Sequence, residues 1–196
     1  MATNSTLTKC LIGEARMNWP RVFEPESFNG SEPKYNITLS FPKTDQALAK
    51  KIQGAINECA EKAKAQYGGK LPKSFKLPEL KDGDEDFETE GYAGLYVIKA
   101  SSKYKPEIVK KATVMGKTQL VPITSADEFY AGCYGYASVT FFAYDTPASK
   151  GISCGLNSIL KTKDGERFDG AGSSAEADYA DILNDIEDPF EDDEVC

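Results

Sequence analysis

The stretch Cys133-Tyr-Gly-Tyr-Ala-Ser-Val-Thr-Phe-Phe-Ala-Tyr-Asp145 decides the fold class. It is rich in β-branched and aromatic residues, contains no proline and alternates with a period of two, which predicts a β-strand. One face is small and apolar, suits a barrel interior, and consists of Cys133, Ala137, Val139, Phe141 and Ala143. The other face is suited to stacking bases or covering a second layer, and it carries Tyr134, Tyr136, Ser138, Thr140, Phe142 and Tyr144.

Further strands flank this one in the sequence. Residues 151–161 are expected to pair with it across a turn at 145–150, and residues 34–41 alternate cleanly until Pro42. Residues 7–17 are predicted as a first strand, with Leu7, Leu11 and Ala15 among its alternating residues, and 24–31 as a loop. Residues 94–101 are predicted as a strand, and 102–128 as an irregular excursion with a short hairpin around Met115-Gly116.

Two helices complete the pattern. Thr44 or Asp45 can cap a helix over 44–67, placed after the second strand, whose apolar face recurs every three or four residues: Leu48, Ile52, Ile56, Cys59 and Ala63. Gly68-Gly69 ends it, and 70–91 is predicted as a long surface loop. A capping box at Ser173 and Glu176 predicts a second helix over 173–187. Residues 188–196 are expected to be a disordered acidic tail.

This order predicts a mostly β fold, a small partly closed barrel with one inserted amphipathic helix and a C-terminal helix. A single domain is expected over residues 1–172. Five cysteines, with no CxxC pair, predict reduced thiols in a cytosolic compartment. No secretory signal and no run long enough to span a membrane is visible.

Charge is distributed unevenly along the chain. Residues 1–163 hold 22 Lys and Arg against 18 Asp and Glu, a net charge of +4, whereas residues 164–196 have a net charge of −12. Six of the acids in the first part lie between Asp82 and Glu90. The chain is therefore a basic body with an acidic tail, so its overall charge of −8 does not exclude nucleic-acid binding.

Enzymatic chemistry has little support in the sequence. There is no histidine, which excludes Ser-His and Cys-His nucleophile pairs, and no phosphate-binding glycine motif is present. The alternating acids from Asp82 resemble a calcium loop, but Phe87 and Ala93 stand where Gly and Glu are required. A metal-dependent nuclease that uses the Asp82–Glu90 acids remains a lesser alternative. The expectation is a non-enzymatic protein without metal or cofactor.

Aromatic and basic residues are interleaved in several segments, which is the mixture that single-stranded nucleic acid requires. Cations neutralise phosphates, and flat rings stack on bases without reading sequence. The predicted phosphate contacts are Arg16, Arg21, Lys99, Lys103, Lys105 and Lys150. The predicted stacking residues are Trp19, Tyr104, Tyr134 and Tyr144, and Phe23 and Tyr35 belong to the same predicted DNA-binding set.

A family resemblance rests on three blocks in order: Arg21-Val-Phe-Glu-Pro25 with Glu32-Pro-Lys-Tyr35 and Phe41-Pro-Lys43; Asp82-Gly-Asp84 with Tyr92-Ala-Gly94 and Lys105-Pro106; and Phe129-Tyr-Ala-Gly-Cys-Tyr134 with Phe142-Ala-Tyr144, Lys150-Gly-Ile152, Gly155-Leu-Asn157 and Asp164-Gly-Glu166. Over residues ~9 to ~185 the chain resembles the phage single-stranded DNA-binding proteins long catalogued as a domain of unknown function. The resemblance implies an OB-fold that binds single-stranded DNA during phage replication or recombination, in the cytoplasm of the infected bacterial host.

The acidic end is similar to the C-terminal tips of single-stranded DNA-binding proteins. Its predicted functional residues are Asp188, Phe190, Glu191, Asp192, Asp193 and Glu194. They are expected to compete with DNA for the basic groove, to recruit replication or recombination proteins, or to do both, and a tail that only keeps the protein soluble is the alternative. A strand-annealing or recombination-mediator protein is the main alternative function, and a homodimer stays open.

Overall fold

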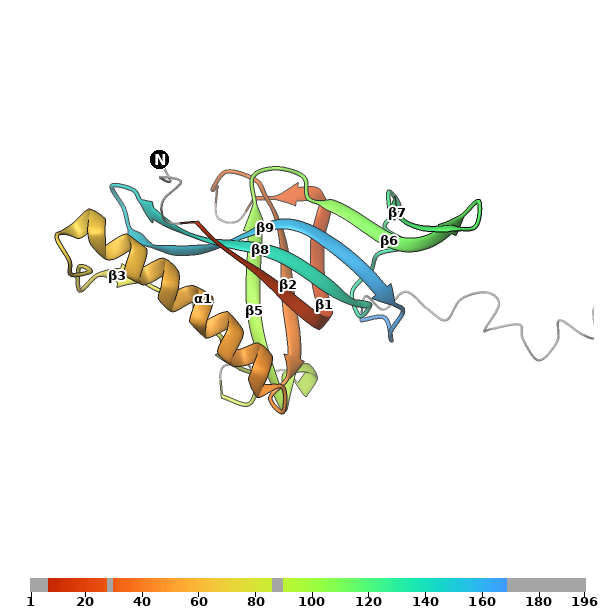
Figure 1. Ribbon diagram of the computed structural model, residues 1–196, viewed down its shortest axis with the longest axis horizontal. Helices are drawn as coiled ribbons and strands as arrows, with labels where there is room; N and C mark the ends of the chain where they lie inside the picture. Colours follow the sequence, from red (N-terminus) through yellow and green to blue (C-terminus); the bar gives the residue numbers. More distant parts are fainter. Residues whose placement is uncertain (1–6, 28–29, 86–89, 169–196) are drawn as a thin grey trace, which may run out of the picture.

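Five strands form a closed barrel in the computed structural model, which describes residues 7–27, 30–85 and 90–168 (Figure 1). They are β1 (Thr8–Glu26), β2 (Lys34–Pro42), β5 (Leu95–Ser102), β8 (Tyr134–Asp145) and β9 (Lys150–Lys163). Hydrogen bonds join them in the order β5-β2-β1-β8-β9. A parallel pairing of β5 with β9 at Ser101 and Gly155 closes the ring. Mostly β architecture is thus confirmed, and the barrel is closed rather than partly open.

Strand β8 has the two faces that its sequence predicts. The small and apolar residues Ala137, Val139 and Phe141 are fully buried in the core, and the aromatic face is only half-buried. The pairing of β8 with β9 runs from Tyr134–Lys163 to Asp145–Lys150, across the expected turn. Every second side chain of β8 therefore fills the interior of the barrel.

Strand β1 is longer than predicted. It runs for 19 residues instead of stopping at residue 17, and it pairs with β8 through its first half and with β2 through its second half. A register shift between Ile12 and Ala15 reverses which side chains face inward. Leu7 and Leu11 are consequently exposed, although the alternation grouped them with the buried Ala15.

Helix α1 (Gln46–Lys64) follows β2, where the sequence placed it, and continues as the short 3-10 helix η2 (Ala65–Tyr67). Asp45 is the N-cap, and its carboxylate accepts a hydrogen bond from the Leu48 backbone N–H at 2.9 Å. All five residues of the predicted apolar face are buried. They pack mainly against β1 and β8 and so cover one side of the barrel (Figure 1).

The segment after α1 is a loop with two minimal strands, β3 (Phe75–Lys76) and β4 (Lys81–Asp82), and the 3-10 helix η3 (Glu90–Tyr92). β3 pairs with β9 and β4 pairs with β5. Lys43 forms ion pairs with Asp82 and, at 2.6 Å, with Asp84. The Asp84 carboxylate also accepts the Gly94 N–H at 2.7 Å. These acids therefore pin the described part of the loop to the start of β5.

A hairpin of β6 (Glu107–Val114) and β7 (Lys117–Pro122) projects from the barrel (Figure 1). Its turn is at Met115-Gly116, as predicted, and β6 joins the sheet by parallel pairing with β9. The predicted helix over 173–187 and the acidic tail over 188–196 lie outside the described residues.

The four cysteines in the described part of the chain, Cys10, Cys59, Cys133 and Cys154, are buried and form no disulfide with one another. Burial raises the pKa of the Cys59 thiol to about 11 and that of Cys154 to about 12. These thiols are therefore protonated at neutral pH and act as small core residues. No helix in the described ranges has both the length and the apolar character to cross a bilayer.

We expect Phe141→Ala to lower the free energy of unfolding by about 3–5 kcal/mol, because it empties a fully buried position between barrel strands. Phe142→Ala is the matched control, since the neighbouring ring faces outward and is half-buried, and it should cost less than half as much. Urea unfolding monitored by circular dichroism measures both. Equal losses would contradict the assignment of the two faces.

We expect Lys43→Met to destabilise the protein at neutral pH and to do so less as the pH falls. Lys43 lowers the pKa of Asp82 and of Asp84 below the usual 3.8. A lowered carboxyl pKa stabilises the fold above its unfolded value, and this contribution is lost as the pH falls through the folded pKa. Thermal unfolding of wild type and variant should therefore converge below about pH 4. Lys117→Met, in the exposed hairpin, controls for net charge, and a difference that does not depend on pH would contradict the pairing.

Candidate nucleic-acid interface

Polar residues form two rows across the outer face of β1, β2 and β5. Cross-strand pairing aligns Asn18 with Thr38 and Thr38 with Lys99 in the first row. The second row aligns Arg21 with Asn36 and Asn36 with Ser101. Because side chains alternate along a strand, the residues between them, such as Ile37, Leu39 and Ile98, fill the core. The outward side of these three strands is therefore polar, with Arg21 and Lys99 exposed, Asn36 and Ser101 half-buried, and Asn18 and Thr38 buried.

Trp19 stands at the edge of this face. It lies in the register shift between Asn18 and Arg21 and has φ of +46°, a conformation that residues other than glycine seldom adopt. Such backbone strain costs about 1–3 kcal/mol and is concentrated at functional sites. The bulge turns the indole outward, where 56% of the side chain is exposed. A side-chain hydrogen bond joins it to Tyr92, whose pKa is raised by burial.

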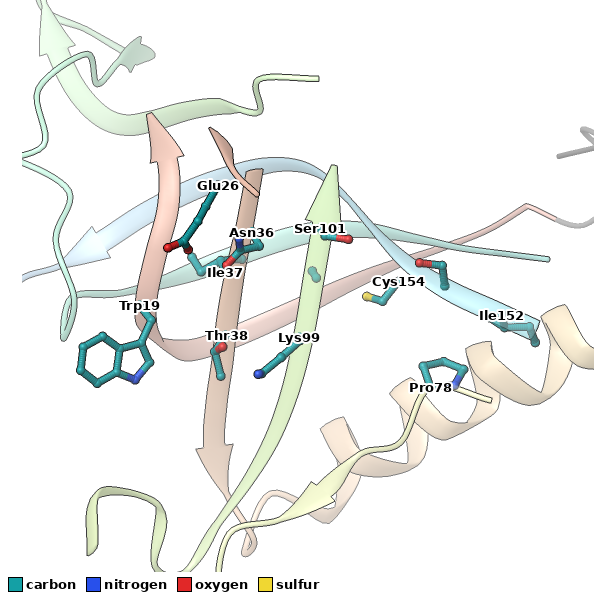
Figure 2. A pocket seen from close by; sticks show the side chains of 12 residues that line it. Trp19, Glu26, Asn36, Ile37, Thr38, Pro78, Lys99, Ser101, Ile152 and Cys154 are labelled. Carbon is teal, nitrogen blue, oxygen red and sulfur yellow. The ribbon is translucent and has the colours of Figure 1, made fainter. Parts of the chain in front are cut away.

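Two hollows meet at Trp19, Thr38 and Lys99. The larger, of about 560 Å³, runs along β2 and β5 toward β9 and includes Glu26, Asn36, Ser101, Pro78 and Cys154 (Figure 2). The smaller, of about 420 Å³, is completed by Asn18, Gly91, Tyr92 and Phe168. Figure 2 shows Trp19, Thr38 and Lys99 beside one another across the three strands. The shared corner thus combines an exposed aromatic face, a hydroxyl and a cation.

Several of the predicted phosphate contacts form ion pairs with carboxylates within the described residues, whereas Lys99 does not. Arg21 pairs with Glu26 at 3.3 Å, Lys103 pairs with Glu32, and Lys150 pairs with Asp145 at 2.9 Å. Lys99 makes no ion pair with any residue in the described ranges, and its side chain is exposed. Its charge is therefore available to an anion without first displacing a carboxylate.

The remaining residues predicted near this face surround one end of it. Tyr35 is half-buried and pairs with Ser102, while Tyr104 is 83% exposed beyond the end of β5. Phe23 instead packs edge-on against the buried Phe129, with ring centroids 6.5 Å apart. The Lys105 ammonium lies over the Phe23 ring at 5.9 Å. Phe23 is thus chiefly a packing residue, whereas Tyr104 is available to a ligand.

Four predicted residues lie elsewhere. Arg16 is half-buried and opposite Tyr134 on β8, with its guanidinium 3.8 Å from the centre of the Phe168 ring. Tyr144 and Lys150 are at the far end of β8 and β9, where the Lys150 ammonium lies 5.6 Å from the Tyr67 ring. The structure therefore does not gather the whole predicted set into one site.

Sequence reasoning did not assign several residues that line the two hollows. Asn18, Thr38, Asn36 and Ser101 carry no aromatic or charged signal, and only the strand register places them together. Tyr92 does carry a sequence signal, because it begins a stretch, residues 92–105, in which tyrosines and lysines are interleaved. For Phe168, a single ring that follows the last strand, the sequence pattern contains no comparable signal.

A second basic surface lies at the base of the hairpin. A hollow of about 570 Å³ is lined by Lys110, Lys111, Lys161 and Lys163 together with three acids. Lys110 pairs with Glu128, Lys161 with Asp164 and Lys163 with Glu14, at 2.7, 2.6 and 3.6 Å. These ion pairs neutralise most of its positive charge, so this surface is a weaker candidate for a polyanion than the face with Lys99.

Two of the acids proposed for the nuclease alternative, Asp82 and Asp84, have a structural role. Asp82 and Asp84 share the Lys43 ammonium and accept backbone N–H groups. Within residues 7–27, 30–85 and 90–168 no three His, Cys, Asp or Glu side chains are grouped as a metal site would require.

Comparison with known proteins identifies the family. The family described as Enterobacter phage Enc34, ssDNA-binding protein, matches residues 8–193, so the chain belongs to it. This is a family of phage single-stranded DNA-binding proteins and not of enzymes. Protein p50 of Acyrthosiphon pisum secondary endosymbiont phage 1 is 29% identical over 184 residues, which are 89% of this chain and 94% of p50.

Solved structures agree with this membership. The single-stranded DNA-binding protein from bacteriophage Enc34 in complex with ssDNA has a TM-score of 0.64 and 30% identity, covering 82% of this chain and 89% of that chain. A second structure of the single-stranded DNA-binding protein from bacteriophage Enc34 has a TM-score of 0.61 and 28% identity, covering 87% of this chain and 89% of that chain. Gp2.5, a single-stranded DNA-binding protein of bacteriophage T7, shares the fold at 17% identity, with a TM-score of 0.55 and coverage of 88% and 99%.

Proposed function

We propose that this chain binds single-stranded DNA without sequence specificity through the outer face of β1, β2 and β5. The observation that carries the proposal is the exposed Trp19 beside Lys99, which forms no ion pair within the described part of the chain, at the corner shared by the two hollows. An aromatic face stacks on any base, and a free ammonium binds any phosphate. The family membership and the complex of the Enc34 protein with ssDNA support the same ligand.

We also infer that the barrel is an OB-fold. Its strand pairing supports this class, because the first barrel strand pairs with the second and the fourth while the third and fifth close the ring in parallel. The helix lies between the second and third barrel strands. OB-folds commonly bind oligonucleotides on the face of strands two and three, which here are β2 and β5.

The acidic C-terminal region is proposed to compete with DNA for this face and, during phage replication or recombination, to recruit partner proteins. Residues 169–196 hold 11 acids and no base. They follow Phe168, which lines the hollow with Trp19 and Lys99. A tethered polyanion has a high effective concentration at a site close to its attachment point, so competition needs only weak intrinsic affinity.

Replacing the two corner residues should separate stacking from charge. Trp19→Ala should weaken binding of a labelled oligo-dT by roughly 5- to 150-fold at every salt concentration, because stacking is worth about 1–3 kcal/mol per base. Lys99→Gln should instead reduce the slope of log K against log salt by about 0.7, the value for one phosphate contact on a single strand. Fluorescence anisotropy over a salt series measures both effects.

Lys50→Gln, an exposed change on α1, is the matched control and should leave the slope and affinity at wild-type values. Wild-type binding by both Trp19→Ala and Lys99→Gln would remove this face from the proposal.

A chain that ends at Glu187 should bind the oligonucleotide more tightly than the full chain at low salt. The truncation removes five acids, and the advantage should shrink toward zero near 0.5 M salt, where screening acts over roughly 4 Å. Phe190→Ala retains every charge and should bind like wild type in the same anisotropy titration. Equal affinities of the full and truncated chains at low salt would contradict competition.

A further inference from the structure

Residues 164–168, here named the strap, are held firmly against the barrel. The Tyr130 hydroxyl donates to Asp164 at 2.8 Å, and the Phe168 N–H donates to the Ala131 carbonyl at 3.0 Å. Gly132, at φ +114°, allows a close approach, because a Cβ there would lie 1.8 Å from the Glu166 carbonyl oxygen. The strap is therefore a built part of the fold.

The strap ends with an aromatic ring that is held on one face. The Arg16 guanidinium lies 3.8 Å from the centre of the Phe168 ring, and its Nη2 donates to the Glu166 carbonyl at 3.1 Å. The Tyr134 ring lies 5.7 Å from the same guanidinium. The Arg16 Nε is buried and has no hydrogen-bond partner among the described residues. The contacts of this guanidinium with residues 164–168 are the stacked Phe168 ring and the Glu166 carbonyl. Arg16 thus acts as a positioning residue for Phe168.

Phe168 lines the 420 Å³ hollow together with residues of β1, β2 and β5. Trp19 and Tyr92 contribute two further aromatic rings to its wall, and Lys99 contributes a cation. A flat aromatic ligand that carries a phosphate matches this lining, because its faces can stack on rings while its anion meets the ammonium. The lining therefore has the chemistry of a subsite for one nucleotide.

We propose that Phe168 is a DNA-contacting residue, and that one nucleobase binds in this hollow with Trp19 and Phe168 as its aromatic walls. The inference rests on the proposed function and adds a residue and a subsite to it. Since the acidic region begins at the next residue, a base in this subsite lies at the root of the tail. DNA and tail therefore meet at one defined position.

The test uses the full chain with three substitutions at one position. Phe168→Ala and Phe168→Leu should bind a labelled oligo-dT at least fivefold more weakly, whereas Phe168→Tyr, which keeps the ring, should bind within twofold of wild type. The dependence on salt should keep its wild-type slope, because no charge changes. Phe75→Ala, which removes a half-buried ring near Tyr67, is the matched control and should bind like wild type.

Trp19 is the single tryptophan of the chain and gives a second readout inside the subsite. Oligo-dT should quench its fluorescence in wild type and in Phe168→Tyr, and less in Phe168→Leu. Phe168→Leu retains apolar packing on Arg16, so it keeps the test decisive if circular dichroism shows that Phe168→Ala is unfolded. If Phe168→Leu bound oligo-dT with wild-type affinity, the ring would have only a structural role. If it bound oligo-dT more tightly, the ring would block the hollow and DNA would have to displace it. Either result overturns the inference.

Failure of the proposed function would look different. In that case wild type itself would bind oligo-dT weakly at low salt, or would bind it without any change in Trp19 fluorescence.

Discussion

The barrel depends on the bending of β1, which must pair with β8 through one half and with β2 through the other. A straight strand cannot follow such a sharply curved wall, and register shifts are the usual means of bending one. The shift between Ile12 and Ala15 exchanges the buried face, and the shifts after Asn18 carry the strand around the barrel toward Glu26. Closing the ring removes the free edges that an open sheet would expose.

The same bending creates the candidate site. Trp19 lies where the ladder with β2 is interrupted, with φ of +46°, and its ring is held by a side-chain hydrogen bond with Tyr92. In a regular strand, the side chain at this position would follow the strict alternation of inward and outward side chains. The irregularity instead delivers a large ring to the outer face beside Lys99. The feature that closes the barrel therefore also orients its exposed aromatic residue.

Much of the fold could be predicted from periodicity. The two faces of β8, the apolar stripe of α1 and the turn at Met115-Gly116 follow from local rules that the tertiary structure preserves. The faces of β1 were not predicted, because register shifts change the period within the strand. Gly13 and Pro20, which lie in two of these shifts, are the residues that could have indicated the irregularity. Trp19 and Lys99 could be named because an aromatic ring and a cation carry chemistry wherever they lie. Their neighbours Thr38 and Asn36 became apparent only from the pairing of β2 with β1 and β5.

Ion pairing explains why the basic body is less uniform than its composition suggests. Arg21, Lys103 and Lys150 each have a carboxylate within the described residues, so a phosphate must replace an existing partner there. Exposed pairs of this kind contribute about 0–1 kcal/mol, which a polyanion can exchange at little cost. Lys99 has no ion-pair partner among the described residues, so no exchange with them is needed, and it lines a hollow together with Phe168. Under the proposed function, an incoming strand therefore gains most at this hollow, beside the residue at which the acidic region begins. In the proposed competition, a tail carboxylate and a DNA phosphate are thus alternative partners of the same cation, Lys99.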